Sequence, residues 1–405
     1  MSSDDEWQTY VKDSRTICKY GAKCYQKNVE HHKTYKHPPK NMKAIKNTRD
    51  KRKFSPFTRK NKEKTVNNQT PNTSTVQIQD TDENISGPIE TLSHNSNDVN
   101  IKMKIPDNIK YYSINPNHEL FKELFLVHMP NDFYKFYECF DGYEIVRLLS
   151  TVNLELIGPY DLLLGKLPIV DDKELYLVHW RFYFDPPEFQ AVIKKKGNSQ
   201  FHIGYYRDNP DDKPQFLASN DSEKDCRITP IASNIFAAVY FYLENEKKTS
   251  PFVAMACQKV MDKLKKTALE NNICIEKYSV QDRQAHCITK TLHGAGIVVP
   301  YNKKTQLGYR HLTESDANLK KIFIKLENAA NQIEKNKVLS ELQPVITYAN
   351  IAVDECDFGT GLEAGIDLFC SGLKELEPSA LSCLISAYNL LNRGDFSNII
   401  MVCFY

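Results

Sequence analysis

The sequence predicts an α+β protein built from four successive parts. Three observations predict this class: cysteines and histidines gather near the start, a polar tract without hydrophobic periodicity follows, and short aromatic strand patterns give way to helical periodicity near residue 229. We expect a small Cys2His2 zinc finger at 14–39, a disordered basic linker at 40–105, an α+β domain with an antiparallel sheet at 106–228, and a mainly helical domain at 229–405. A chain of 405 residues is long enough for two or three domains.

Four possible zinc ligands, Cys18, Cys24, His31 and His37, stand close together near the start of the chain. Two thiolates and two imidazoles satisfy tetrahedral zinc, and in so short a segment the metal replaces a hydrophobic core. His32 is the competing histidine, and the spacing alone does not decide between it and His31. The pattern therefore predicts a zinc finger.

The expected linker begins with a strongly basic block. Residues 40–64 contain eleven lysines and arginines and two acids, Asp50 and Glu63. Residues 67–100 are rich in Asn, Thr, Ser and Gln and cannot bury enough apolar surface to order themselves. The basic block is interpreted as a nuclear import signal or as a weak nucleic-acid contact through phosphate neutralisation. A merely solvated linker is the alternative.

The sheet of the third part is predicted from short aromatic and β-branched runs separated by turn formers. The runs lie too close together for crossover helices, which favours antiparallel pairing. Their aromatic stripe is interpreted as core. We expect helices at 118–126 and 132–139 and strands at 175–184, 189–193, 201–206 and 215–218.

The fourth part shows near-3.6-residue apolar periodicity. Residues 313–316 are a plausible capped helix start, and residues 291–300 and 307–312 are irregular. The apolar end at 398–405 is either a truncated last helix or an alternative terminus. Helices are expected at 231–245, 252–271, 313–331, 335–349, 362–372 and 379–392.

Composition and termini favour an intracellular soluble protein with no membrane partner. The eleven cysteines are an odd number and are scattered, mostly within apolar runs, as expected of buried reduced thiols. The acidic start of the chain does not resemble a signal peptide. The longest apolar run, 231–243, is shorter than the roughly 18 residues needed to cross a bilayer.

A pair of adjacent acids is the most informative feature of the helical part. Asp354 and Glu355 directly precede Gly359 and Gly361, which we interpret as a glycine-rich turn leading into an apolar helix. Neighbouring side chains diverge along a backbone, so the two acids are expected to do different work. The alternative is an acidic first turn that favours the dipole of the following helix.

The finger resembles the poly(ADP-ribose)-binding zinc finger family. That resemblance implies that Tyr20 and Tyr25 stack on adenine of the polymer. The chain departs from the family pattern at Gln26, Val29 and Pro39. The matching residues are Cys18, Tyr20, Gly21, Cys24, Tyr25, Lys27, Asn28, His31, His37 and Pro38.

Residues from about 106 to 400 resemble the histone PARylation factor family. Two motifs carry the resemblance, His-Gly-Ala-Gly-Ile-Val-Val-Pro…Gly-Tyr-Arg at 293–310 and Asp-Glu-Cys-Asp-Phe-Gly-x-Gly-Leu-Glu-x-Gly at 354–365. The resemblance implies a non-autonomous accessory factor that binds the catalytic domain of a DNA-damage-activated poly(ADP-ribose) polymerase. It would complete that active site and direct ADP-ribosylation onto serines of histones and of the polymerase itself.

The same resemblance assigns roles to individual residues. It makes Glu355 the catalytic carboxylate and places Asp354, Tyr309 and Arg310 on the polymerase-docking surface. Gln306 stands where the family prefers an acid. It further implies zinc in the finger, NAD bound by the partner polymerase, histones and poly(ADP-ribose) as partners, and a location in the nucleus, on chromatin at DNA breaks.

The chemistry agrees with these assignments. A serine hydroxyl becomes acidic only as its bond to the ADP-ribosyl centre forms, and a positioned carboxylate then accepts the proton, an effect of roughly 10²–10⁴-fold. Residues 293–296 lack the context of a dinucleotide-binding fingerprint, so NAD is expected from the partner.

Two alternatives remain at this point. One is a non-catalytic poly(ADP-ribose) reader that is recruited through the finger. The other is a stand-alone hydrolase that uses Asp354 and Glu355, although adjacent residues are poor partners across one bond.

Overall fold

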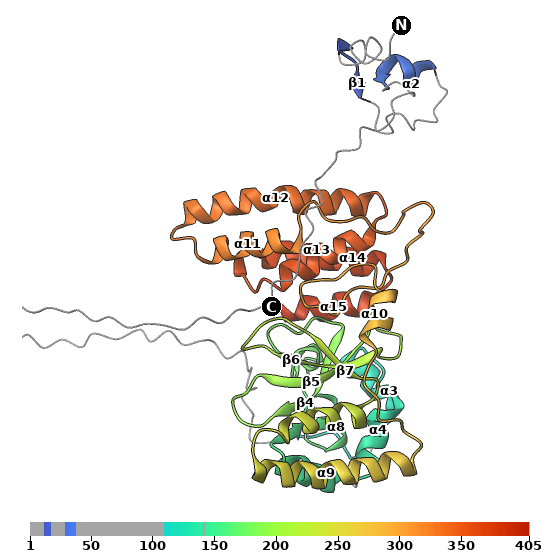
Figure 1. The fold of residues 1–405 in the computed structure, drawn as a ribbon, viewed down its shortest axis with the longest axis vertical. Helices are drawn as coiled ribbons and strands as arrows, with labels where there is room; N and C mark the ends of the chain where they lie inside the picture. The colour runs from blue at the N-terminus through green and yellow to red at the C-terminus, as the bar shows by residue number, and fades with distance from the viewer. Residues whose placement is uncertain (1–11, 18–28, 38–108, 115, 141, 405) are drawn as a thin grey trace, which may run out of the picture. The chain divides into compact units, whose positions relative to one another are not determined.

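The computed structural model describes residues 12–17, 29–37, 109–114, 116–140 and 142–404 (Figure 1). The chain divides into two compact units, Met1–Leu92 and Ser93–Tyr405, which are treated separately below. The predicted linker at 40–105 lies outside the described residues.

The first unit contains three short described elements. Strands β1 (Thr16–Ile17) and β2 (Tyr35–Lys36) pair in parallel, and helix α2 (Val29–Thr34) leads directly into β2. Cys18, Tyr20, Cys24 and Tyr25 lie outside the described residues.

The second unit is built on a five-stranded antiparallel sheet with the order β3-β4-β5-β6-β7. This confirms the predicted α+β class and antiparallel pairing. Gly204 permits the close approach of two strands, because a Cβ there would lie 2.5 Å from the carbonyl oxygen of Gln190. The strands are β3 (Leu154–Leu156), β4 (Phe189–Lys195), β5 (Phe201–Tyr206), β6 (Phe216–Asp221) and β7 (Thr229–Ala232).

Helices cover both faces of this sheet. Helices α11 to α14 form a layer on one side, with α15 between them and the sheet, and α8 and α9 lie on the other side (Figure 1). Side-chain caps begin several helices; Ser315, for example, accepts a hydrogen bond from the Asn318 amide at the start of α11, within the predicted capped segment. The helices that form these layers are α8 (Ile235–Glu246), α9 (Pro251–Glu270), α11 (Asp316–Glu327), α12 (Gln332–Asp354), α13 (Phe358–Phe369), α14 (Glu377–Leu390) and α15 (Gly394–Cys403).

The second unit also contains six shorter α-helices among its described residues. They are α3 (His118–Phe125), α4 (Asn131–Glu138), α5 (Gly142–Thr151), α6 (Pro159–Leu163), α7 (Leu175–Val178) and α10 (Val280–His286). The structure adds α5, α6, α10, β3 and β7 to the predicted elements. It also makes a helix, α15, of the segment that includes the apolar residues at 398–403.

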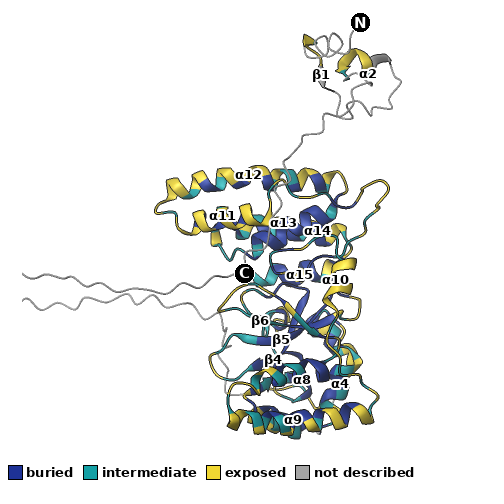
Figure 2. Cartoon of the chain, in the orientation of Figure 1, coloured by how far each residue is buried: buried dark blue, intermediate teal, exposed yellow. Residues whose placement is uncertain are grey.

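The main hydrophobic core joins side chains from both sides of residue 228 (Figure 2). It contains Phe133 and Ile203 together with Phe236 and Leu384, all fully or almost fully buried. β7, which starts at Thr229, pairs with β6. The predicted boundary after residue 228 therefore falls within one shared core and stays a prediction. A second apolar cluster lies among α11, α12, α13 and α14.

The strand predicted at 175–184 is wrong. Its first residues form α7, and the backbone then reverses at Trp180, which has a φ of 57°. Asp161 Oδ2 accepts hydrogen bonds from both His179 Nε2 (2.9 Å) and Trp180 Nε1 (2.8 Å). These side-chain bonds fold the aromatic run back on itself, so tertiary context overrides its β propensity.

The cysteines and the helix lengths can be read directly from the described residues. Every cysteine in the described residues is a free thiol, and Cys257, Cys370 and Cys383 are buried as predicted. Among the described residues, no helix combines the length and apolar character required to cross a membrane.

Candidate functional site

The two predicted acids lie at the junction between α12 and α13. Asp354 is the last residue of α12 and Glu355 is its C-cap, and both side chains are exposed. Cys356 then adopts a φ of 68°, which turns the chain sharply into α13. Helix α13 starts at Phe358, so neither acid lies in its first turn, and the alternative interpretation in terms of the dipole of the following helix is wrong. The acids stand instead at the carbonyl end of α12, which disfavours nearby carboxylates.

The glycine-rich turn predicted after these acids is also wrong, because Gly359 and Gly361 lie inside α13. They permit close packing there. A Cβ at Gly359 would lie 2.7 Å from Val299 Cγ2 and 3.0 Å from the carbonyl oxygen of Gly308, and one at Gly361 would lie 2.4 Å from Val353 Cγ2. The glycines let α12 and the segment from Thr289 to Arg310, which we call the irregular segment, lie directly against α13.

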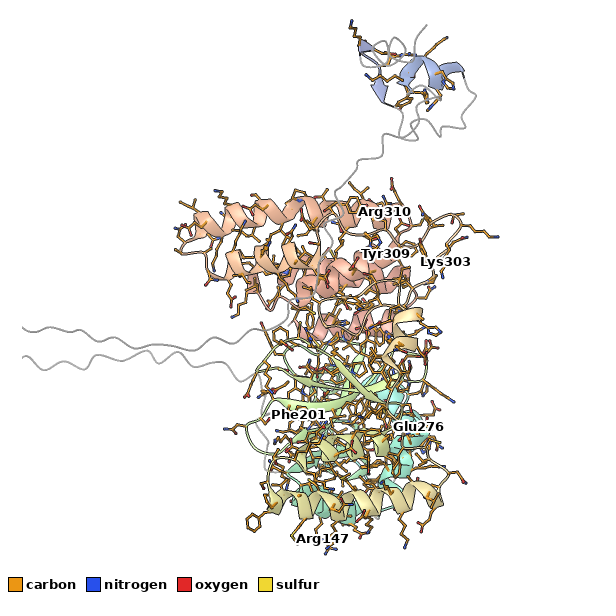
Figure 3. The ribbon with its side chains drawn as sticks, in the orientation of Figure 1. Arg147, Phe201, Glu276, Lys303, Tyr309 and Arg310 are labelled. Carbon is orange, nitrogen blue, oxygen red and sulfur yellow. The ribbon has the colours of Figure 1, made fainter. Side chains whose placement is uncertain are left out.

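Arg310 binds two acids of the junction between α12 and α13. Its Nη2 donates to Glu355 Oε2 at 2.5 Å and its Nε donates to Asp357 Oδ2 at 2.6 Å. The guanidinium also lies 5.7 Å from the centre of the Tyr348 ring, in cation–π range. The Arg310 side chain is 28% exposed and that of Glu355 is 42% exposed, so the pair stands at the surface. In Figure 3, Arg310 and Tyr309 lie at the end of the helical layer, beside the loop that carries Lys303.

The backbone on either side of Arg310 is fixed by α13. Gly308 donates its amide to Asp357 Oδ1 at 2.8 Å and accepts a hydrogen bond from the Gly359 amide at 2.9 Å. The Thr360 hydroxyl accepts from the Arg310 amide at 2.9 Å and donates to the Arg310 carbonyl oxygen at 2.7 Å. The arginine therefore projects from a backbone segment with little freedom to move.

Tyr309 points inward. Its ring is 5% exposed, and its hydroxyl lies 3.0 Å from Glu363 Oε2 and 3.0 Å from His311 Nδ1. The second oxygen of Glu363 accepts a hydrogen bond from the Thr289 hydroxyl at 2.8 Å. The predicted role of Tyr309 at the docking surface stays a prediction; in this structure its side chain supports the Arg310 segment from within.

Burial and charge set the protonation of these groups. Burial lowers the pKa of Arg310, but its hydrogen bonds to Glu355 and Asp357 outweigh that effect and raise it above the ordinary value. Burial raises the pKa of the Glu363 carboxyl to about 7, against the opposing hydrogen bonds from Thr289 and Tyr309. Burial also raises the pKa of Asp367 well above its usual range.

Three residues of this arrangement, Asp357, Thr360 and Glu363, were not predicted from the sequence. Together with Asp367 they form what we call the polar stripe of α13, which includes its N-cap. The spacing 357, 360, 363 and 367 places all four on one side of the helix. A line of polar residues on a helix whose other residues are apolar or glycine was the available signal.

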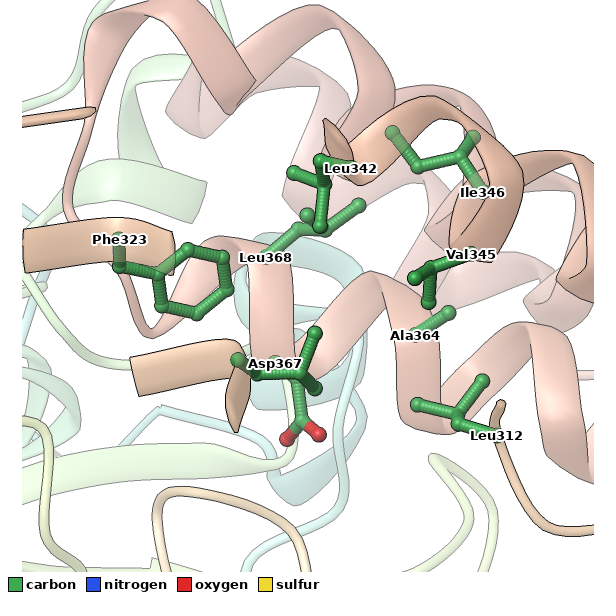
Figure 4. A pocket seen from close by; sticks show the side chains of 9 residues that line it. Leu312, Phe323, Leu342, Val345, Ile346, Ala364, Asp367 and Leu368 are labelled. Atoms are coloured by element: carbon green, nitrogen blue, oxygen red, sulfur yellow. The ribbon is translucent and has the colours of Figure 1, made fainter. Parts of the chain in front are cut away.

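Two cavities in the described part of the chain lie away from Glu355. One is an apolar gap of about 10 Å³ between α11, α12 and α13, no larger than a single water (Figure 4). Asp367 lines its edge with the carboxylate turned away from Leu342 and Val345, and accepts the Leu292 amide at 2.8 Å. The other, of about 260 Å³, is open and is lined by residues including Asp132, Tyr205 and Lys213.

The described part of the first unit fits a zinc site. His31 Nε2 and His37 Nε2 lie 3.2 Å apart. Two nitrogens bound to one tetrahedral zinc at about 2.0–2.1 Å would be separated by roughly 3.3 Å. This geometry supports the predicted use of His31 and His37, while the proposed thiolates of Cys18 and Cys24 lie outside the described residues.

Comparison with known proteins covers both units. The family model described as Histone PARylation factor 1 matches residues 116–404, and the PBZ domain model matches residues 15–40. The chain belongs to the histone PARylation factor 1 family. Both predicted resemblances are thereby confirmed, and the site described above lies within the matched region.

Individual relatives agree with the family match. Histone PARylation factor 1 of Bos taurus is 39% identical over 282 residues, covering 67% of this chain and 81% of the relative. The Danio rerio protein of the same name is 39% identical over 287 residues, covering 69% and 82%. A Homo sapiens protein named putative histone PARylation factor 1-like is 36% identical over 309 residues, covering 72% and 87%.

Proposed function

We propose that this protein is an accessory factor that lends Glu355 to the active site of a DNA-damage-activated poly(ADP-ribose) polymerase and thereby directs ADP-ribosylation onto serine. The observation that carries the proposal is the Arg310–Glu355 pair, an exposed carboxylate fixed at the end of a helix by an arginine. An acid in this position faces outward, where a partner's active site can receive it.

The rigid setting of the pair supports a catalytic use. General-base catalysis requires a carboxylate at a defined distance from the proton it accepts. Arg310 orients Glu355, and Asp357 and Thr360 hold Arg310 in turn. As the serine oxygen bonds to the ribosyl carbon and nicotinamide leaves, Glu355 would accept the hydroxyl proton.

The exposure of Glu355 supports a shared site. Catalytic sites usually lie in concave pockets that exclude water and position the substrate. Glu355 instead occupies an exposed helix end and lines neither of the two cavities described above. We therefore assign NAD binding and enclosure of the reacting atoms to the polymerase, and docking to Asp354 and Arg310.

We assign the first unit to recruitment. The match to the PBZ domain and the His31–His37 geometry support a zinc-stabilised module that binds poly(ADP-ribose) through Tyr20 and Tyr25. A factor that binds the polymer would gather where the polymerase is active, on nuclear chromatin at DNA breaks, where histones are its substrates. The basic block at 40–64 would add a weak phosphate contact.

The test is transfer of ADP-ribose to a serine peptide by an activated polymerase with the full-length chain. Glu355→Gln removes the base and keeps the side-chain shape, so we expect retained docking and a loss of serine transfer of about 100-fold or more. Arg310→Ala should mainly weaken docking. Glu327→Gln, an exposed glutamate on α11, is the matched control and should behave as wild type.

The outcomes separate the three functions. Equal serine transfer by wild type and Glu355→Gln would overturn the catalytic assignment. If finger variants alone abolished recruitment while Glu355→Gln stayed fully active, the protein would be a reader. Release of ADP-ribose from a modified peptide by the isolated protein would identify a hydrolase.

A further inference from the structure

The polar stripe of α13 binds the irregular segment between Thr289 and Arg310 at successive points. Asp367 accepts the Leu292 amide at 2.8 Å, and Glu363 accepts hydrogen bonds from the hydroxyls of Thr289 and Tyr309. Thr360 and Asp357 then hold the backbone of Arg310 and Gly308. One helix thus fixes a long segment without regular secondary structure.

Glu363 occupies a special place in this series. Asp357 and Thr360 contact Arg310 itself, which is partly exposed, whereas Glu363 is 5% exposed and contacts Tyr309, the residue directly before Arg310. Tyr309 is likewise 5% exposed. The buried carboxyl and the surface pair are therefore connected through one tyrosine hydroxyl and one peptide bond.

We propose that Glu363 is a positioning residue that holds the Tyr309 hydroxyl and thereby sets where the Arg310–Glu355 pair stands when a polymerase docks. This inference rests on the proposed function. Glu363 is buried in the body of the protein and would act through Tyr309.

The protonation of Glu363 decides how strongly Tyr309 is held. The ionised carboxylate accepts from Thr289 and Tyr309 at once, one on each oxygen, which is the arrangement observed. A carboxyl protonated on Oε2 donates to the Tyr309 oxygen instead of accepting from it, which leaves the Tyr309 hydroxyl to donate to His311 Nδ1, 3.0 Å away. The other charged groups that face Glu363 are Asp316, at the start of α11, and Asp367, one turn further along α13.

The experiment measures the Kd of the full-length chain for the activated polymerase from about pH 6 to about pH 8.5, for wild type and Glu363→Gln. Taking the ratio of the two constants removes the polymerase's own pH dependence. Because the wild-type carboxyl has a pKa of about 7, the variant should match wild type at low pH. It should bind about threefold to tenfold more weakly at high pH.

Tyr309→Phe supplies the second arm, because it removes the hydroxyl and keeps the ring. In this background the ratio of the Kd of the double variant Tyr309→Phe/Glu363→Gln to the Kd of Tyr309→Phe should not change across the same pH range. The reason is that the two residues act as one unit. Tyr301→Phe, a nearby tyrosine with its ring centre 6.5 Å from that of Tyr309, is the matched control and should keep the wild-type pH dependence. Two results would overturn the proposal. One is a Kd ratio for Glu363→Gln that does not change with pH in the wild-type background. The other is a Kd ratio for Glu363→Gln that changes with pH in the Tyr309→Phe background as it does in wild type.

A measurement on the free chain keeps this inference separate from the proposed function. If wild type fails to bind the polymerase, the proposed function fails. Hydrogen exchange of the Arg310 amide, which donates to Thr360, then decides the inference. Faster exchange in Tyr309→Phe than in Tyr301→Phe supports it, and equal exchange in the two variants overturns it.

Discussion

Two buried carboxylates of the polar stripe of α13, Asp357 and Glu363, have partners of different charge. At what we call the Arg310 end of the stripe, Asp357 is paired with the charged guanidinium of Arg310. At the Glu363 end, Glu363 is paired with two neutral hydroxyls. Both carboxylates fix the same irregular segment, yet burial raises the pKa of Glu363 to about 7.

The difference follows from the charge of the partner. In the interior, the neutral form of a carboxyl is favoured unless a charge partner is present. Arg310 supplies that charge to Asp357, and its hydrogen bonds to Asp357 and Glu355 outweigh the effect of its own burial. The Arg310 end, where the arginine is 28% exposed, is therefore suited to docking with a partner, and the Glu363 end to a response to pH.

The largest effect is expected from breaking the Arg310 end of the stripe. Asp357→Ala leaves the Gly308 amide and one side of Arg310 without their partner, which should lower the free energy of unfolding by about 3 kcal/mol. Chemical denaturation measures it. Asp354→Ala, at the adjacent exposed acid, is the control and should change stability by less than about 0.5 kcal/mol. Equal losses in both variants would contradict the comparison.

The Glu363 end of the stripe should show its own pH dependence. The folded pKa of Glu363 lies above the unfolded value of 4.5, so the folded state binds more protons between about pH 4.5 and 7. Its contribution is present at low pH and is lost as the pH rises through about 7, a loss of about 3 kcal/mol for a pKa raised from 4.5 to about 7. Glu363→Gln should lack this loss in unfolding measured across that range. An identical pH dependence in wild type and variant would show that Glu363 does not titrate in this window.

A smaller effect should come from forcing the stripe and the arginine segment apart. Gly359→Ala places a Cβ 3.0 Å from the Gly308 carbonyl oxygen and 2.7 Å from Val299 Cγ2. We expect a loss of about 1–2 kcal/mol, together with weaker docking of the displaced Arg310. Gly394→Ala is the control, because a Cβ there meets nothing within 4 Å. Thermal unfolding of both variants would decide, and a neutral Gly359→Ala would show that the contact relaxes freely.

The smallest effect on this site should come from zinc removal. The finger and the body are separate compact units. A chelator, or His37→Ala, should therefore unfold the finger and change the stability of the body by less than about 0.5 kcal/mol. Zinc release and calorimetry of the full chain measure the two effects. Loss of the body's unfolding transition on chelation would contradict this independence.

Much of the fold could be predicted because it depends on local patterns. Helical periodicity located α8 and α9 to within a few residues, and aromatic runs bounded by turn formers located β4 and β5. The same reasoning failed at 175–184, where Asp161 draws His179 and Trp180 away from an extended course. It failed again at Gly359 and Gly361, whose neighbours come from distant segments.

The sequence by itself determined the family motifs, the antiparallel sheet, most helices and the exposed acid proposed as the base. Only the tertiary structure decided that Arg310 pairs with Glu355 and Asp357, that Tyr309 points inward, and that Glu363 holds it. The physical reason is distance along the chain. Periodicity and turn chemistry act over a few residues, whereas these contacts join segments about 50 residues apart that meet only when α13 packs against the irregular segment.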